Sequence, residues 1–330
     1  MANLNPSELE GIITEALMAN RTAEGNARSV ARALVLAEID GKKGHGLSRV
    51  PSYAGQAQSG KVDGHASPGA ESPRPGVLAI DAGHGFAYPA FDLMQSALPE
   101  MAQRNGIAMA AIRRSHHYGV AGHHVEKLAD QGLVALLFGN TPAAMAPWGG
   151  KTPLFGTNPI AFAAPVAGRE PMVSDLATPR VARRNLLTAS PKGNPIPEGW
   201  ALDADGAPTT DPVAALKGSM VPMAGAKGAA LALMIEVLAA ALTGAAFGRD
   251  ATSFFDSGGN PPNTGQLMIA IDPSATADDM AGRLAMLAGL IEDDGARLPG
   301  SSRMARRQAA ATDGLDVDAA ALDAAVTLGR

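Results

Sequence analysis

Residues 106–139 read GIAMAAIRRSHHYGVAGHHVEKLADQGLVALLFG, and this stretch indicates the fold of the whole chain. The apolar run Ile107–Ile112 is typical of a buried strand, and a second run of the same kind follows at Leu133–Phe138. Between them, Val120–Gln131 has the spacing of a helix. A glycine precedes each strand, where the chain must turn. A strand, a helix and a strand in succession predict an α/β protein.

The same alternation continues on both sides of this stretch. A short strand is predicted at Val77–Asp81, followed by a helix at Phe91–Arg104 in which Pro99 is a point for a kink. Alternation of this kind predicts a sheet covered by helices. The other elements predicted by the same patterns are strands at Pro159–Ala164, Pro171–Asp175 and Gln266–Ile271 and a long helix at Lys227–Leu242.

Both ends of the chain are predicted to be helical. Ser7 and Glu10 match the capping box that opens a helix, here one that reaches Asn20. The segment Lys42–Gly76 is rich in Gly, Ser and Pro and is predicted to be mainly loop. We therefore expect a mainly helical terminal subdomain of residues 1–75 plus 296–330 and an α/β domain of residues 76–295. The remaining terminal helices are predicted at Ala23–Asp40, Ala277–Glu292 and Asp316–Leu328.

Composition narrows the possible function. The 330 residues carry a net charge of −5 without a long basic run, which argues against nucleic acid as a partner. The absence of cysteine excludes disulfides, thiolate nucleophiles and cysteine-bound metal centres. The longest apolar stretch, Ala229–Leu242, contains Glu236 and is too short to span a membrane. The N-terminus has no signal-peptide pattern, so a cytoplasmic protein without a membrane partner is expected.

The common nucleotide and hydrolase motifs are missing. Two glycine pairs begin a G-x-G-x-x-G pattern at Gly44 and Gly83, but Arg49 and Tyr88 stand where the third glycine belongs. The end of a P-loop is imitated at 150–152 without its leading glycine, and no G-x-S-x-G is present. These absences exclude particular folds but not phosphate binding, because backbone N–H groups and basic side chains also bind phosphates.

Four of the seven histidines lie in the segment 115–124, SHHYGVAGHH. They are a candidate metal site, although the H-E-x-x-H spacing is absent. The alternative for His123 and His124 is that they cap or face the start of a helix. His117 follows a predicted strand and precedes Gly119 and a helix, which is where α/β enzymes place reactive side chains. His116 competes with it for that position.

A fifth histidine, His45, lies between two glycines in the segment 44–49, GHGLSR. Glycine on both sides allows a sharp turn that presents the imidazole to a cleft. Arg49 follows four residues later and shares a face with His45 if the segment is helical. An arginine fork binds a carboxylate, and a nearby histidine transfers a proton to the adjacent atom. The alternative is a solvent-exposed turn.

With these residues the chain resembles the malate/L-lactate dehydrogenase type 2 family, which includes malate, sulfolactate and ureidoglycolate dehydrogenases and Δ1-piperideine-2-carboxylate reductases. The resemblance implies a homodimer with a non-Rossmann NAD(P)-binding fold, a central mixed sheet flanked by helices. The matching stretches, in family order over nearly the whole chain, are Gly44–Tyr53 (GHGLSRVPSY), Ser115–Gly119 (SHHYG), Pro147–Lys151 (PWGGK), Phe155–Pro159 (FGTNP), Ala226–Gly228 (AKG) and Pro299-Gly300 with Arg303.

The resemblance also implies roles for individual residues. The α/β domain of residues 76–295 is expected to bind the coenzyme and the substrate. His45 is expected to give a proton to the substrate, with His117 competing for this acid/base role and standing at the coenzyme boundary. Arg49 is expected to bind the substrate carboxylate, with Tyr53 and Thr157 in the same pocket. The residues expected to contact NAD or NADP are His117, Asp175, Leu176, Ala177, Lys227, Gly228 and Arg303.

Two departures from the family pattern bear on mechanism and substrate. Gly44 stands where members commonly have Ser, and the missing hydroxyl bears on the orientation of His45 and on its proton relay. In the stretch 183–185, Arg184 adds bulk and charge near the coenzyme side, where it either selects a phosphate or is a surface residue. For a dianionic substrate, Arg184 and His116 are the candidates for a second cation. The expected reaction is hydride transfer between nicotinamide and the α-carbon of a small 2-oxo or 2-imino acid of the Δ1-pyrroline/Δ1-piperideine-2-carboxylate type. The alternatives are a malate-, sulfolactate- or lactate-type 2-hydroxy acid dehydrogenase, a metal-dependent hydrolase or lyase that uses the His116–His124 cluster, and a non-catalytic relative. No metal is expected under the main hypothesis.

Overall fold

The computed structural model describes residues 1–190 and 194–330, and its largest element is a seven-stranded mixed sheet. In this sheet β3 and β4 pair in parallel, and the other neighbours are antiparallel. It is therefore not the parallel sheet of doubly wound nucleotide-binding domains. In spatial order the strands are β2 (Gly69–Arg74), β3 (Val77–Asp81), β4 (Ile107–Ser115), β11 (Thr264–Ile271), β5 (Val134–Gly139), β6 (Ile160–Val166) and β7 (Arg169–Leu176).

The stretch that predicted the fold forms the centre of this sheet. β4, α5 (Ala121–Ala129) and β5 follow one another in the chain, as expected. However, β11 lies between β4 and β5 and pairs antiparallel with both. Such an insertion of a strand from more than a hundred residues away cannot be inferred from local periodicity, because periodicity reports burial and not the identity of the neighbour.

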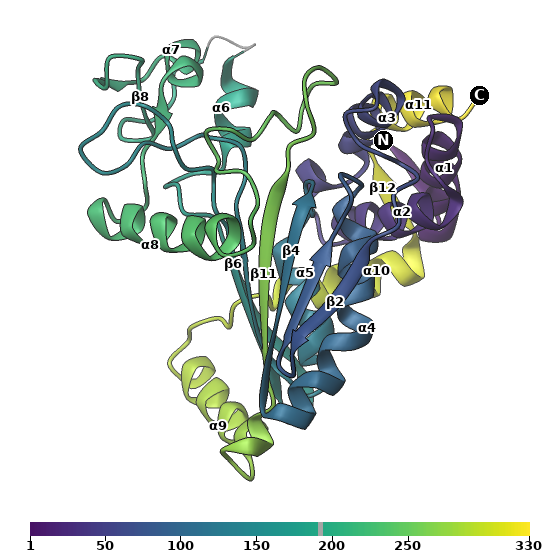
Figure 1. The fold of residues 1–330 in the computed structure, drawn as a ribbon, viewed down its shortest axis with the longest axis vertical. Coiled ribbons are helices and arrows are strands. Elements are labelled where there is room, and N and C mark those ends of the chain that lie inside the picture. Colours follow the sequence, from purple (N-terminus) through teal and green to yellow (C-terminus); the bar gives the residue numbers. More distant parts are fainter. Residues whose placement is uncertain (191–193) are drawn as a thin grey trace.

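Helices cover both faces of the sheet (Figure 1). Alternate residues of β4 point to opposite faces. Ala108, Ala110 and Ile112 pack with α4 (Ala87–Asn105) and α5, whereas Met109 and Ala111 pack with the segment that contains Ile235 and Ala239. That segment consists of α8 (Ala226–Glu236) and a π-helical turn η4 (Val237–Ala241). The predicted fold class, an α/β protein with a central mixed sheet flanked by helices, is confirmed.

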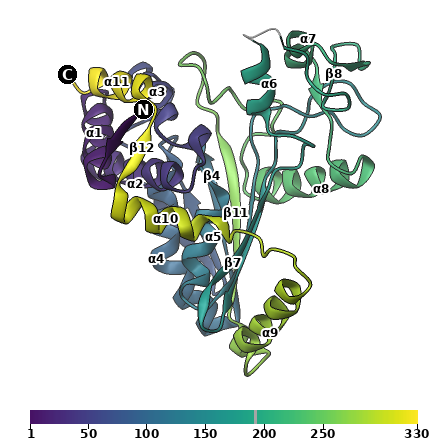
Figure 2. The same ribbon diagram turned by 180° about the vertical axis from the view of Figure 1, so that it is seen from behind.

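The two ends of the chain lie together beside the sheet (Figure 2). β1 (Ala2–Leu4) pairs antiparallel with β12 (Leu315–Val317). A separate apolar core joins the helices around them. The division into residues 1–75 plus 296–330 and residues 76–295 stays a prediction; β2 belongs to the large sheet. The helices of this region are α1 (Pro6–Ala19), α2 (Glu24–Ile39), α3 (Val50–Ser59), α10 (Ser302–Asp313) and α11 (Ala319–Leu328).

A third region, not predicted from the sequence, stands at the end of the sheet that carries α8. It contains a small sheet in the order β10-β8-β9 with its own apolar core. At the opposite end of the sheet α9 (Met280–Asp293) protrudes (Figure 1). In the described residues no helix is long and apolar enough to cross a membrane. The elements of the third region are α6 (Arg183–Ala189), β8 (Ala201–Leu202), β9 (Pro208–Thr209), α7 (Pro212–Lys217) and β10 (Ser219–Met220).

Several local predictions were wrong. The first helix begins at Pro6, and its cap is Asn5, whose side chain accepts a hydrogen bond from the Ser7 N–H, so Ser7 is not the cap. The segment 42–76 is not mainly loop, because α3 and β2 lie within it. In α3 the buried residues Val50, Tyr53 and Ala57 recur at helical spacing among Gly, Ser and Pro, which masked the pattern. The helix α10 was also missed.

Candidate active site

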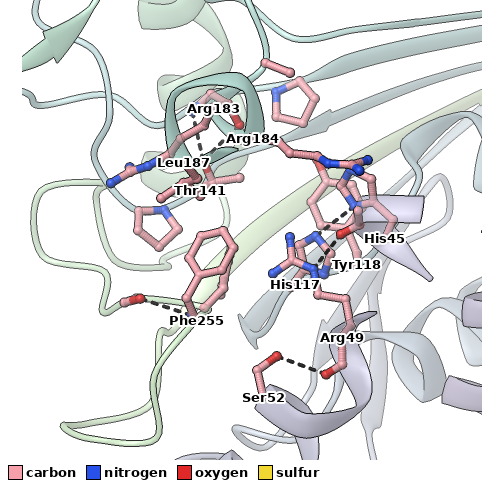
Figure 3. A pocket seen from close by; sticks show the side chains of 18 of the residues that line it. His45, Arg49, Ser52, His117, Tyr118, Thr141, Arg183, Arg184, Leu187 and Phe255 are labelled. Atoms are coloured by element: carbon pink, nitrogen blue, oxygen red, sulfur yellow. Dashed lines mark hydrogen bonds between the residues drawn. The ribbon is translucent and has the colours of Figure 1, made fainter. Parts of the chain in front are cut away.

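A pocket of about 1100 Å³ opens between the start of α3, the loop after β4, α6 and the segment 248–257. Of the residues predicted to be functional, the pocket wall contains His45, Arg49, His117, Thr157 and Ala177. Figure 3 shows His45 and His117 together, with Arg49 rising from the start of α3 and Arg184 reaching from α6. Side chains separated by more than a hundred residues in the chain are thus brought to one site.

The turn that carries His45 depends on glycine and on a buried carboxylate. His45 ends the short helix η1 (Lys43–His45), and Gly46 separates it from η2 (Leu47–Arg49). A Cβ atom at Gly46 would collide with the side chain of Glu38. That carboxylate accepts a hydrogen bond from the Leu47 N–H at 2.8 Å and pairs with Lys43 at 2.9 Å. Glu38 therefore holds the loop in the shape that presents His45.

The two histidines of the pocket form one unit. Their rings are stacked, with centroids 5.1 Å apart and planes at 8°. The Nδ1 atom of His45 lies 3.2 Å from Nε2 of His117, and Nδ1 of His117 lies 2.5 Å from the hydroxyl of Tyr53. The Tyr53 hydroxyl in turn lies 3.2 Å from that of Tyr88. Both ring nitrogens of His117 are therefore engaged, whereas Nε2 of His45 remains for a ligand.

Burial and positive charge keep this unit neutral. Burial, followed by the charges of Arg49, Lys42, His123 and Arg184, lowers the pKa of His45 to about 3. Burial, followed by Arg49 and the neighbouring histidines, lowers the pKa of His117 well below its usual value. Burial raises the pKa of Tyr53 to about 12. At neutral pH both imidazoles are thus uncharged.

Arg49 is a partly buried cation of the pocket wall. Its Nε donates to the Gly44 carbonyl at 2.7 Å, and its Cζ lies 4.6 Å from the ring centre of Phe255. One terminal nitrogen, Nη1, is buried without a hydrogen-bond partner in the described part of the chain. A buried, unpaired donor is costly unless a ligand satisfies it.

The charge of the pocket wall is of one sign. None of its described residues is Asp or Glu, although the chain as a whole carries a net charge of −5. An electropositive pocket in an acidic protein attracts anionic ligands. The cationic residues of the wall are Lys42, Arg49, Arg183, Arg184 and Arg249.

Comparison with known proteins assigns the chain to a family. The sequence model for malate/L-lactate dehydrogenase matches residues 4–324. The chain belongs to the malate/L-lactate dehydrogenase family. It is an oxidoreductase, as the sequence predicts, and the resemblance stated above is confirmed.

Two proteins of similar sequence are a dehydrogenase and a reductase. The (2R)-3-sulfolactate dehydrogenase (NADP(+)) of Chromohalobacter salexigens is 50% identical, over 91% of this chain and 90% of that protein. The Δ1-pyrroline-2-carboxylate/Δ1-piperideine-2-carboxylate reductase of Pseudomonas putida is 40% identical, over 94% of this chain and 92% of that protein.

Solved structures of the family have the same fold. The Δ1-piperideine-2-carboxylate reductase of Pseudomonas syringae pv. tomato superposes with a TM-score of 0.94 at 37% identity, covering 99% of this chain and 100% of that one. The sulfolactate dehydrogenase of Methanocaldococcus jannaschii gives a TM-score of 0.86 at 29% identity, covering 99% and 96%.

Five residues that the resemblance assigned to the site lie in the pocket wall or next to it. Tyr53 is fully buried behind His117 and reaches the pocket only through that ring. Thr157 lines the pocket, and its N–H donates to the Thr141 hydroxyl at 2.9 Å. Asp175 accepts a hydrogen bond from the Gly122 N–H at the start of α5, and burial raises the pKa of Asp175. Leu176 beside it is exposed, and Ala177 completes the wall.

The other predicted coenzyme residues lie away from this pocket. Arg303 is buried, and its three side-chain nitrogens donate to Glu126 at 2.8 Å, to the Pro171 carbonyl at 2.9 Å and to the Gly300 carbonyl at 3.1 Å. Lys227 is exposed in the first turn of α8, and a Cβ atom on Gly228 would collide with the Met223 carbonyl. Contact between these residues and a coenzyme stays a prediction.

The remaining histidines are not grouped as metal ligands. His123 Nε2 lies 2.9 Å from Asp40, and His124 Nε2 lies 2.8 Å from the Tyr118 carbonyl. His116 is buried among aromatic rings. Among the residues described, no three His, Asp or Glu side chains stand close enough to hold a metal ion. The geometry therefore offers no ligand set for the alternative of a metal-dependent hydrolase.

Sequence reasoning missed several residues of the wall. Arg183 donates to the Ala143 carbonyl at 2.9 Å from α6, and Phe254 and Phe255 face the histidines and Arg49 from the segment 248–257. The pair of adjacent phenylalanines in a chain with 4% aromatic residues was the one available signal. Nothing local indicates that this segment returns to the pocket.

Proposed function

We propose that this chain transfers a hydride between NAD(P) and the α-carbon of a small 2-oxo or 2-imino carboxylic acid, with Arg49 as the carboxylate ligand and His45 as the proton donor. One observation carries the proposal. Among the described residues, the open Nε2 of His45 and the unpartnered Nη1 of Arg49 share a pocket whose wall contains no carboxylate. A guanidinium fixes a carboxylate in a defined orientation, so that the adjacent carbon and its oxygen or nitrogen lie beside the imidazole.

A nicotinamide coenzyme fits the chemistry of this pocket. NADP is the coenzyme named for the 50% identical sulfolactate dehydrogenase. Its phosphates are anions, and the pocket has a cationic wall and a volume of about 1100 Å³. His117 and Ala177 are the wall residues proposed to hold it, with Asp175, Leu176, Lys227, Gly228 and Arg303 as further proposed contacts. When bound, the coenzyme supplies or accepts the hydride.

The protein's own contribution is the proton. In reduction His45 Nε2–H donates to the substrate oxygen or nitrogen, and in oxidation the neutral ring accepts that proton. The neutral state of His45 suits oxidation directly. For reduction, the substrate carboxylate offsets the charge of Arg49, one cause of the low pKa of His45, and this raises that pKa. We propose that His45 takes up its proton together with the anionic substrate.

The relatives divide between the two predicted substrate types. The P. putida protein is named for cyclic imines and the C. salexigens protein for sulfolactate. A cyclic imino acid requires an apolar wall beyond its single carboxylate, whereas a 2-oxo or 2-hydroxy acid with a second acidic group requires more positive charge. The cationic wall favours the second type.

The test is a substrate panel with the purified full chain. Oxidation of NADPH and of NADH is followed with pyruvate, oxaloacetate, sulfopyruvate, Δ1-pyrroline-2-carboxylate and Δ1-piperideine-2-carboxylate. Turnover of at least one of these acids with either coenzyme is expected. The absence of turnover with all of them, in protein that binds the coenzyme, would contradict the proposal.

A homodimer is also proposed, with a cytoplasmic location. The support for the homodimer is a set of exposed apolar side chains. On α9, Met286 is 73% exposed and Leu290 is 67% exposed. On α8, Leu233 and Met234 are exposed as well, and so is Val237 at the start of η4. Such faces are costly in a monomer and are typical of an interface between copies. Light scattering should give a molar mass of twice that of one chain. The double variant Met286→Glu with Leu290→Glu should give the mass of a single chain.

A further inference from the structure

The pocket holds a second arginine near the reacting position. Arg184 lies in the wall together with Arg49, and its charge is among the causes that lower the pKa of His45. In the described part of the chain the guanidinium of Arg184 has no ion-pair or hydrogen-bond partner. Figure 3 shows it reaching from α6 toward His45, while Arg49 comes from the start of α3. The substrate position beside His45 therefore lies between two cations.

The position of Arg184 depends on Gly44. A Cβ atom built on Gly44 would lie 3.2 Å from Cδ and 3.6 Å from Nη1 of Arg184. The arginine stem therefore rests directly against the backbone before His45. A side chain at residue 44 would press on this stem, which would have to shift by a few tenths of an ångström. Gly44 and Arg184, the two departures noted in the sequence, are thus one structural feature.

We infer that Arg184, seated against Gly44, forms a second anion subsite, so that the preferred substrate is a 2-oxo or 2-hydroxy acid with a further carboxylate or sulfonate beyond the reacting carbon. This inference rests on the proposed function, in which Arg49 binds the first carboxylate. Arg184 is exposed at the pocket wall, and a dianion bound between it and Arg49 would make a charge-assisted contact at each end.

Neighbouring side chains are poorer candidates for this role. The guanidinium of Arg183 is partly buried, and its Nη1 is engaged by the Ala143 carbonyl. His116 is 1% exposed and is not part of the wall. Burial lowers the pKa of His116 to about 3, so its ring carries no charge at neutral pH.

The experiment compares substrates of the same backbone length with one or two charges. The ratio of kcat/KM for sulfopyruvate to that for pyruvate is measured in the wild type and in Arg184→Gln. Loss of a charge-assisted contact predicts that this ratio falls about 10- to 100-fold. Arg184→Lys should restore part of it. Gly44→Ser, which displaces the stem, should lower the ratio in the same direction.

Arg249→Gln is the matched comparison, because it removes a charge from the same wall on another segment, and it should lower the ratio less than Arg184→Gln does. An unchanged ratio in Arg184→Gln would overturn the inference. A raised KM for the coenzyme, with equal losses of kcat/KM on both acids, would also overturn it and would assign Arg184 to the coenzyme. Calorimetric binding of malate and lactate to the NADP-loaded protein applies the same comparison without turnover. Weaker malate binding in Arg184→Gln would then support the subsite even if the wild type reduced no acid of the panel.

Discussion

Two clusters of arginine and histidine lie within this molecule, and they differ in one respect. In the first, named here the clasp (Asp40, His123, Glu126, Arg303 and Arg307), each basic group meets a carboxylate. Arg307 bridges Asp40 and Glu126 at 2.8 Å, and Arg303 meets Glu126 at 2.8 Å. In the pocket, Arg49, Arg184 and His45 meet no carboxylate in the described residues. The ion pairs of the clasp connect the end of α2 with α5 and α10. The arginines of the pocket have no such partner in the described residues and are available to an anionic ligand.

The pKa values express the same difference. Burial raises the pKa of Asp40, but hydrogen bonds from His123 and Arg307 outweigh it and lower the value to about 2. For His45, burial and the nearby cations act in the same direction and lower the pKa to about 3. The clasp therefore stabilises the charged form of its acid, while the pocket disfavours the charged form of its base. The first arrangement suits the fold and the second suits chemistry with an anion.

The largest predicted effect concerns the pocket. His45→Ala should lower turnover about 10²- to 10⁴-fold, the range for loss of a general acid, with coenzyme binding and the free energy of unfolding nearly unchanged. Steady-state kinetics and a fluorescence titration measure both. His123→Ala is the matched change in the clasp. It should lower the free energy of unfolding and leave turnover close to the wild-type value. Near wild-type reduction by His45→Ala would remove His45 from the role.

In the clasp, Glu126→Ala should lower the free energy of unfolding by about 3–5 kcal/mol, because two arginines are left without their buried partner. Urea unfolding measures this. Glu292→Ala, which breaks an exposed pair with Arg169, is the control and should cost less than about 1 kcal/mol. Equal effects of the two substitutions would refute the contrast between the clasp and the surface.

The clasp should also respond to acid. The pKa of Asp40 is lowered from 3.8 to about 2 on folding, so its contribution to stability is complete above about pH 4. That contribution is lost as the pH falls toward 2. Urea unfolding of the wild type and of Asp40→Asn across this range should show a steeper loss for the wild type. Parallel curves would show that Asp40 is not the titrating group.

Arg49→Lys should lower kcat/KM for every carboxylate substrate about 10- to 100-fold, because a lysine cannot bond to the Gly44 carbonyl and a carboxylate with one planar fork. In contrast to Arg184→Gln, the loss should be similar for acids with one and two charges. A loss confined to dianions would reverse the assignment of the two arginines.

The smallest effect is expected at Tyr53. Tyr53→Phe removes the partner of His117 Nδ1 and should slow reduction by a few fold, about the value of one hydrogen bond. Reduction should weaken as the pH rises through the pKa of substrate-bound His45, and oxidation should strengthen. The midpoint of this profile should move in Tyr53→Phe if the tyrosine acts through His117. A slower enzyme with an unmoved midpoint would indicate a packing role only.

The secondary structure around the site was largely predictable from the sequence. The strands β3 and β5 and the helix α5 match their expected positions within a few residues, because apolar periodicity records which face is buried. The spacing of His45 and Arg49 predicted a shared face if the segment is helical, and both residues line the pocket. The third region and the loop 248–257 were not predictable, because their short elements carry too few residues for a period to emerge.

The sequence by itself determined the alternation of helices and strands, the absence of nucleotide fingerprints and the presence of His45, Arg49 and His117, since these depend on local spacing and residue type. Only the tertiary structure decided which of these groups is free to act. His45 and His117 lie 72 residues apart in the chain, and Arg303 and Glu126 lie 177 apart. Because pairing and desolvation are set by neighbours in space, the sequence does not show that the guanidinium of Arg303 is paired with Glu126 in the clasp, and its predicted contact with the coenzyme stays a prediction.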